Sequence, residues 1–138
     1  MGLRKRSGLR GGIFFITTTI VDCFPVFRSQ RYYQILADCL NFLRQNRRLS
    51  VFAYVFMPNH IHLIVGLPKD CVLSQEIGKF KSYTSLQIRH LVQKEGWEDA
   101  LKVFRKAAVK YPDQQFKVWM ERFDDVSIYS RYIFETKM

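Results

Sequence analysis

Apolar positions repeat along the chain with two different periods. Residues 13–21, 50–56 and 60–66 are rich in β-branched and aromatic side chains, and each predicts a strand. The second and third segments are separated only by a short turn that contains Pro58, so they predict a β-hairpin. Residues 116–128 alternate between apolar and polar side chains and predict a final strand.

Two other segments carry apolar residues at helical spacing. Residues 29–48 begin at a candidate N-cap, Ser29, and end in a basic turn that suits the helix dipole. Residues 73–92 predict a second amphipathic helix, and a shorter helix is expected within 95–115, closed by Pro112. The supporting apolar positions are Tyr33, Leu36, Leu40 and Leu43 in the first helix and Ile77, Phe80, Leu86 and Leu91 in the second.

The order of these elements predicts an α+β fold. It gives the ferredoxin-like β-α-β-β-α-β arrangement, an antiparallel sheet with helices packed on one face. We expect a single domain over residues 13–138, preceded by a basic flexible arm over residues 1–12. A last short helix is expected to start near Ser130.

The chain is strongly basic, with 22 Lys and Arg against 12 Asp and Glu and a net charge of +10. This excess indicates a polyanionic partner, most commonly nucleic acid. A membrane is disfavoured, because no stretch approaches the roughly 18 apolar residues of a spanning helix. The basic arm has two interpretations, a solvated segment or an arm that contacts phosphate.

The three cysteines follow no metal-binding or disulfide pattern. Cys23, Cys39 and Cys71 are widely spaced and odd in number, and the sequence has no C-x-x-C. We expect them to be reduced and to act as small hydrophobic residues in a cytoplasmic protein.

His60 and His62 are the main candidates for chemistry. Alternate residues of a strand share a face, so both imidazoles project together and could hold a divalent cation through neutral nitrogens. Such a cation would polarise a phosphodiester for attack, and a tyrosine nucleophile would conserve the bond energy. The alternative is a pair of surface histidines on an open sheet face, which is the more frequent arrangement for an isolated H-x-H.

The segment "AYVFMPNHIHLIV" resembles the signature of the HUH single-tyrosine transposases, in particular the REP-associated tyrosine transposase (IS200-like transposase) branch. Three more segments are similar to parts of that family: "GGIFFITTTIVD" to its first strand, "EIGKFKSYTSLQI" to its second helix, and "FKVWMERFDDVSIYS" to its W-x-x-R-F block. The resemblance covers most of the chain from Gly11 onward.

This resemblance implies a DNA transposase that nicks and rejoins single-stranded DNA at hairpin-flanked sites. It implies Mg2+ or Mn2+ as cofactor, a transient 5′-phosphotyrosine, and a homodimer. His60 and His62 match the metal-binding pair of the family.

The nucleophile is the point at which the sequence departs from the family pattern. In the family a further helix supplies the tyrosine and an amide ligand, and its place falls just beyond Met138. Tyr129 and Tyr132 lie nearest to that place, whereas Tyr83 on the second helix is a poorer candidate. Packing is the competing role for all three. The alternative function is therefore a catalytically incomplete remnant that binds hairpin or single-stranded DNA. An RNA-binding domain ranks last, because it would carry aromatics where the histidines stand.

Basic residues next to aromatic ones mark the candidate DNA surface. Basic side chains supply the salt-dependent phosphate contacts, and aromatic rings stack on unpaired bases. The competing role is a solvated helix face, with the tryptophan in the core. The candidates are Lys79, Lys81 and Arg89 on the second helix and Lys117, Trp119 and Arg122 on the last strand.

Overall fold

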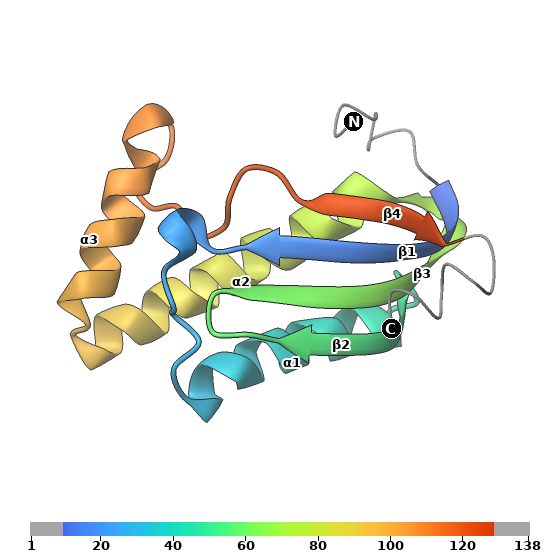
Figure 1. Ribbon diagram of the computed structural model, residues 1–138, viewed down its shortest axis with the longest axis horizontal. Coiled ribbons are helices and arrows are strands. Elements are labelled where there is room, and N and C mark those ends of the chain that lie inside the picture. The colour runs from blue at the N-terminus through green and yellow to red at the C-terminus, as the bar shows by residue number, and fades with distance from the viewer. Residues whose placement is uncertain (1–9, 129–138) are drawn as a thin grey trace.

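Four antiparallel strands form one sheet, and two long helices cover one of its faces (Figure 1). The computed structural model describes residues 10–128, and the strand order is β2-β3-β1-β4. This confirms the predicted ferredoxin-like arrangement. The elements are β1 (Arg10–Thr19), η2 (Val21–Cys23), α1 (Gln30–Gln45), β2 (Ser50–Phe56), β3 (His60–Val72), α2 (Leu73–Glu95), α3 (Glu98–Ala107), η3 (Ala108–Lys110) and β4 (Asp124–Ile128).

The core lies between the sheet and the helices α1 and α2. Alternate residues of the two central strands are buried, such as Ile16 of β1 and Ile61 and Leu63 of β3. Leu36 of α1 and Phe80 of α2 are buried in the same cluster. Each such side chain contributes about 1.5–3 kcal/mol by leaving water. Burial on one face leaves the intervening strand residues on the opposite, open face of the sheet.

Two strand boundaries differ from the sequence-based prediction. β1 begins at Arg10, so residues 10–12, expected in the basic arm, belong to the strand. Its register with β3 shifts between Arg10 and Gly12, and Gly11 and Gly12 have φ angles of 66° and 98°, which glycine adopts without strain. β3 continues past Gly66 to Val72, because its far end still pairs with β1.

The predicted last strand, residues 116–128, is wrong over most of its length. β4 comprises only Asp124–Ile128, and Trp119 forms a single isolated bridge with Ile20. The segment before β4 is held by separate backbone hydrogen bonds to different neighbours, such as the Val118 carbonyl accepting from Val21 and the Met120 N–H donating to Thr19. The alternation of apolar and polar residues before β4 therefore reflects the packing of an irregular segment and not the pairing of a β-strand.

The helices agree with the periodic pattern apart from their ends. Ser29 is the N-cap of α1, although its hydroxyl makes no capping hydrogen bond. α2 continues to Glu95 and ends at Gly96, whose φ of 64° is a left-handed C-cap conformation. α3 is the predicted short helix and ends at Ala107, before Pro112. No helix within residues 10–128 is both long and apolar enough to cross a membrane.

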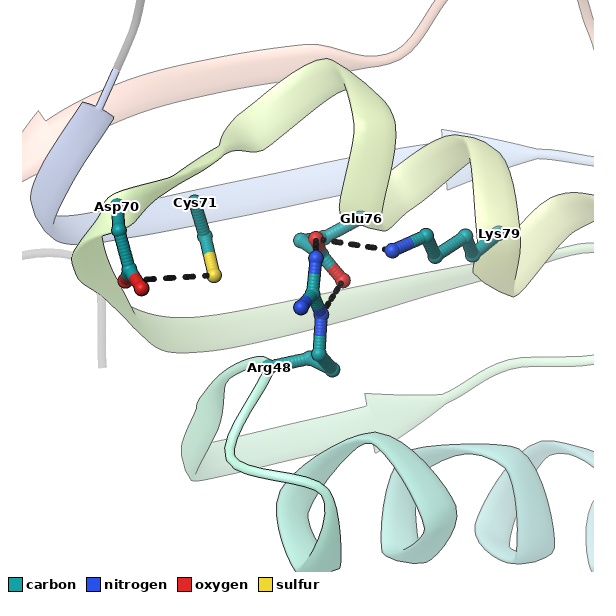
Figure 2. Close-up of polar contacts among 5 residues, drawn as sticks. All are labelled: Arg48, Asp70, Cys71, Glu76 and Lys79. Atoms are coloured by element: carbon teal, nitrogen blue, oxygen red, sulfur yellow. Dashed lines mark hydrogen bonds and ion pairs between the residues drawn. The ribbon is translucent and has the colours of Figure 1, made fainter.

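A buried carboxylate ties the α1–β2 connection to the start of α2 (Figure 2). Glu76 is fully buried and accepts hydrogen bonds from Arg48 at 2.7 Å and 3.2 Å. The Lys79 ammonium lies 3.4 Å from the same carboxylate. Because a buried charge is tolerated only when it is paired and hydrogen-bonded, this cluster fixes the junction at the end of β3 that lies far from His60.

Candidate functional site

His60 and His62 lie side by side at the start of β3, on the open face of the sheet. Their ring centroids are 4.9 Å apart and both residues are half-buried. Ile61, between them, points into the core and is fully buried. The strand alternation predicted from the sequence is therefore present, and it places two imidazoles next to each other on a rigid element.

The His60 ring is held by the residue before it. Asn59 places its side-chain oxygen 2.7 Å from Nδ1 of His60, while its amide nitrogen donates to the Cys23 carbonyl at 3.2 Å. The second bond fixes which end of the Asn59 amide is the oxygen. Because an amide oxygen only accepts hydrogen bonds, Nδ1 of His60 donates to it, and in the neutral ring the lone pair is therefore on Nε2.

The His62 ring is held by the neighbouring strand β1. Thr17 pairs with His62 across the sheet, and its hydroxyl lies 3.0 Å from Nδ1 of that ring. Phe15 stacks on the same ring, with centroids 5.6 Å apart and planes 15° apart. Burial, and then the nearby His60, lower the pKa of His62 and favour its neutral form. When Nδ1 of the neutral ring donates to the Thr17 hydroxyl, Nε2 carries the lone pair and can act as a ligand atom.

The donor set is suited to a divalent cation but is not complete by itself. Two neutral imidazoles supply two nitrogen ligands. Within residues 10–128, no group of three or more His, Cys, Asp or Glu side chains gathers around them or elsewhere. The pair would thus contribute part of a coordination sphere and leave positions for water, phosphate oxygens or another kind of donor.

An apolar hollow lies beside His62. Phe15, Tyr54, Val55 and Ile64 help to line it, and its volume is about 430 Å³. Val55 is more than half exposed, so apolar surface is open to solvent at this place. Such a surface next to a candidate phosphate site is suited to stacking of unpaired bases or packing of their sugars.

Most of the basic residues predicted to contact DNA are engaged in contacts within the fold. Lys79 pairs with Glu76, and Lys117 donates to Glu121 at 2.9 Å. Lys81 donates to the Met120 and Arg122 carbonyls at 2.8 Å and 3.3 Å. The Arg89 guanidinium lies 4.9 Å from the centroid of the Phe116 ring, and Arg122 is exposed. Most of these cations therefore already have internal contacts.

Trp119 is a core residue, and the prediction that it stacks on DNA is wrong. Only 2% of its surface is exposed, and its indole N–H donates to the Thr84 hydroxyl at 2.9 Å. Its ring packs against Phe27 and Phe80. A base cannot reach a ring that is enclosed in this way.

The tyrosine candidates are not brought to the histidines by the described part of the chain. Tyr129 and Tyr132, together with the helix expected near Ser130, lie outside residues 10–128. Tyr83 is exposed on α2, in the helix layer on the far side of the sheet. Tyr54 borders the hollow beside His62, but it pairs with Leu63, whose side chain points to the core face.

Sequence reasoning missed two residues that hold the site. Thr17 and Phe15 are separated by about 45 residues from His62, and only the β1–β3 register brings them together. Alternation within residues 13–21 places Phe15 and Thr17 on one face. No local pattern in the sequence indicates which strand lies beside β3, or in which register.

Comparisons with known proteins identify the family of the chain and agree with its fold. Residues 21–111 match the family model described as "Transposase IS200 like". A REP-associated tyrosine transposase solved with a REP hairpin superimposes with a TM-score of 0.66 at 20% identity, over 99% of this chain and 67% of that one. A transposase candidate from Deinococcus radiodurans R1 gives a TM-score of 0.62 at 13% identity, over 97% and 92% of the two chains. No curated protein sequence matches the chain significantly.

Proposed function

Because the chain belongs to the IS200-like transposase family, we propose that it nicks and rejoins single-stranded DNA at a divalent cation held by His60 and His62. The observation that carries this proposal is the orientation of the two rings. Each Nδ1 is hydrogen-bonded within the fold, His60 to Asn59 and His62 to Thr17. In the tautomers that carry the proton on Nδ1, both Nε2 atoms would be free to bind a cation.

The proposed cofactor is Mg2+ or Mn2+. A cation bound by the two histidines would polarise a nonbridging oxygen of the scissile phosphate. His60 and His62 would hold this cation, and Phe15, stacked on the His62 ring, restricts the orientation of that ring. A cation held on the rigid strand would orient the phosphate for in-line attack.

The proposed nucleophile is a tyrosine. Its phenolic oxygen loses its proton and forms a bond to phosphorus while the bond from phosphorus to the 3′ oxygen breaks. The leaving 3′ oxygen takes up a proton, so the products are a 5′-phosphotyrosine and a 3′ hydroxyl. Attack by a 3′ hydroxyl on this linkage reverses the step and rejoins the strand without outside energy. Tyr132 and Tyr129 remain the candidates in this chain, and peptide mapping of an adduct would identify the residue.

The proposed partner is hairpin-flanked single-stranded DNA. The net charge of +10 supports a polyanion, and the REP-associated relative was solved with a REP hairpin. A second copy of the chain is proposed as the other partner, forming a homodimer. Light scattering after size-exclusion chromatography would give the mass of the particle and decide between one copy and two.

A covalent-adduct assay tests the proposed function. The protein is incubated with labelled hairpin oligonucleotides carrying single-stranded flanks, with Mn2+ or with EDTA, and is run on a denaturing gel. We expect an adduct that requires Mn2+ and disappears in H60A and H62A, while both variants still bind the DNA on a native gel. Equal loss of binding would refute the ligand role of the histidines. Clear binding by the wild type without any adduct would instead support the alternative, a DNA-binding module that does not cut.

A further inference from the structure

The helix α3 stands beyond the end of the sheet at which β1 finishes and the β2–β3 turn lies (Figure 1). Between α3 and the segment before β4 runs a groove of about 580 Å³. Val21, Val103, Ala107 and Met120 contribute its apolar surface. We call it the lysine groove, because Lys102, Lys106, Lys110 and Lys117 line it as well.

Three of these lysines form one basic row. Lys102 and Lys106 are four residues apart on α3, and Lys110 follows after the same interval at the end of η3. All three are exposed. None of them forms an ion pair with another residue of the described range 10–128, in contrast to Lys117, which pairs with Glu121. Their charges are therefore available to an external anion.

The charge of the groove favours an anionic occupant. Four lysines line it against two carboxylates, Asp22 and Glu121, and Glu121 is already bound by Lys117. Exposed lysines beside apolar lining residues match a nucleic-acid strand, whose phosphates are charged and whose sugars and bases are less polar.

The groove is joined to the histidine end of the sheet by backbone hydrogen bonds. Met120 donates its N–H to the carbonyl of Thr19 at 2.8 Å, and Thr19 pairs with His60 across the sheet. Val21, on the other wall, donates to Val118 at 2.8 Å. The groove wall at Met120 is thus fixed to the strand position opposite His60, with only β1 between the groove and the strand that carries the histidines.

We propose that the lysine groove binds the phosphate backbone of the DNA strand that enters the His60–His62 site. This inference rests on the proposed function for the identity of the partner. It assigns phosphate contacts to Lys102, Lys106 and Lys110, none of which belongs to the basic residues that the sequence indicated. The chemical class of the ligand is a single-stranded segment of nucleic acid.

The test is the salt dependence of DNA binding, measured by fluorescence anisotropy in EDTA so that the cation site has no part in it. The probe is a labelled hairpin oligonucleotide with single-stranded flanks. For single strands the slope of log K against log salt is about −0.7 per phosphate contact. The triple variant K102Q/K106Q/K110Q should therefore lose about 2 units of slope. The matched control R44Q/K94Q/R105Q removes the same charge from exposed positions that do not line the groove, and it should keep the wild-type slope.

Removing a negative charge from the groove tests the same assignment, because the expected result is tighter DNA binding. Asp22 is exposed with a φ of 57°, a conformation that asparagine adopts readily. D22N removes a negative charge from the groove and should bind the probe more tightly than the wild type. Equal slopes for the two triple variants, or no gain in D22N, would overturn the groove assignment. If the groove assignment fails but these variants still form adducts normally, the proposed function stands. If the triple groove variant lowers the salt slope but no protein forms an adduct, the groove assignment stands and the proposed function is contradicted.

Discussion

At the scale of single residues, the two histidines are oriented by different parts of the fold. Asn59 holds His60 from within the turn, whereas Thr17 and Phe15 hold His62 from the neighbouring strand. Residues that hydrogen-bond to a ligand histidine and orient its ring contribute to metal affinity without touching the metal. Thr17 is therefore a positioning residue, and its effect should appear in cation binding.

Replacing Thr17 by Val tests this role. The substitution keeps the β-branched shape and removes the hydroxyl beside Nδ1 of His62. We expect T17V to weaken Mn2+ binding by about 10–100-fold, the usual effect of losing such a partner, as measured by electron paramagnetic resonance titration. The control is T19V, on the same face of β1 but paired with His60 and without a hydrogen bond to its ring. Equal losses in T17V and T19V would show that the Thr17 hydroxyl has no special role.

The hydrogen bond between Trp119 and Thr84 provides a second residue-scale prediction. T84V leaves the buried indole N–H of Trp119 without its acceptor, which should lower the free energy of unfolding by about 1–3 kcal/mol. T84S keeps the hydroxyl and should lose less. Urea denaturation measures both. DNA affinity of folded T84V should stay at the wild-type value, because Trp119 is enclosed. A large loss of affinity in the folded variant would instead indicate that Trp119 contacts DNA.

At the scale of elements, the sequence pattern correctly predicted the helices and the hairpin, which depend mainly on interactions between residues close in the chain. The helices α1 and α2 and the β2–β3 hairpin follow from periodicity, because the buried face of each element is encoded by neighbouring residues. The start of β1 and the short β4 could not be predicted, since strand length depends on which residues find a partner across the sheet. The contact between Thr17 and His62 depends on the same long-range register.

The loop between β1 and α1 is tied to the end of α2 by a carboxylate. Glu95 accepts hydrogen bonds from Tyr32 at 2.8 Å and from Arg28 at 2.9 Å, and Arg28 also lies over the Trp97 ring. The bond from Tyr32, and then that from Arg28, lower the pKa of Glu95 below its ordinary value. Ionised Glu95 therefore stabilises the folded chain.

The pH dependence of stability tests this tie. A carboxyl group whose pKa is lower in the folded state contributes stability above its unfolded pKa, about 4.3, and that stability is lost as pH falls through the folded pKa. Urea unfolding at pH 7 and near pH 3 should show a smaller acid loss for E95Q than for the wild type. D113N, at an exposed loop carboxylate, should behave like the wild type. Identical acid losses in E95Q and the wild type would contradict a stabilising role of the Glu95 carboxylate.

At the scale of the whole molecule, the features that bear on function gather at one end of the sheet. His60 and His62 lie at the start of β3, beside the β2–β3 turn, and α3, which lines the lysine groove, stands at the same end of the sheet as this turn (Figure 1). The Arg48–Glu76–Lys79 cluster stabilises the opposite end. The net charge of +10 indicated a polyanionic partner, but composition alone does not show where on the surface that partner binds. Only the fold shows which cations are free and which are engaged with Glu76, Glu121 or backbone carbonyls.

The most direct test of the central claim is a crystal structure of the protein soaked in Mn2+, with the cation located by its anomalous scattering. The proposed function predicts one strong anomalous peak on the open face of the sheet, bonded to Nε2 of both His60 and His62, with Asn59 and Thr17 still at their Nδ1 atoms. A cation bound without either histidine, or no bound cation at the pair at saturating Mn2+, would contradict it.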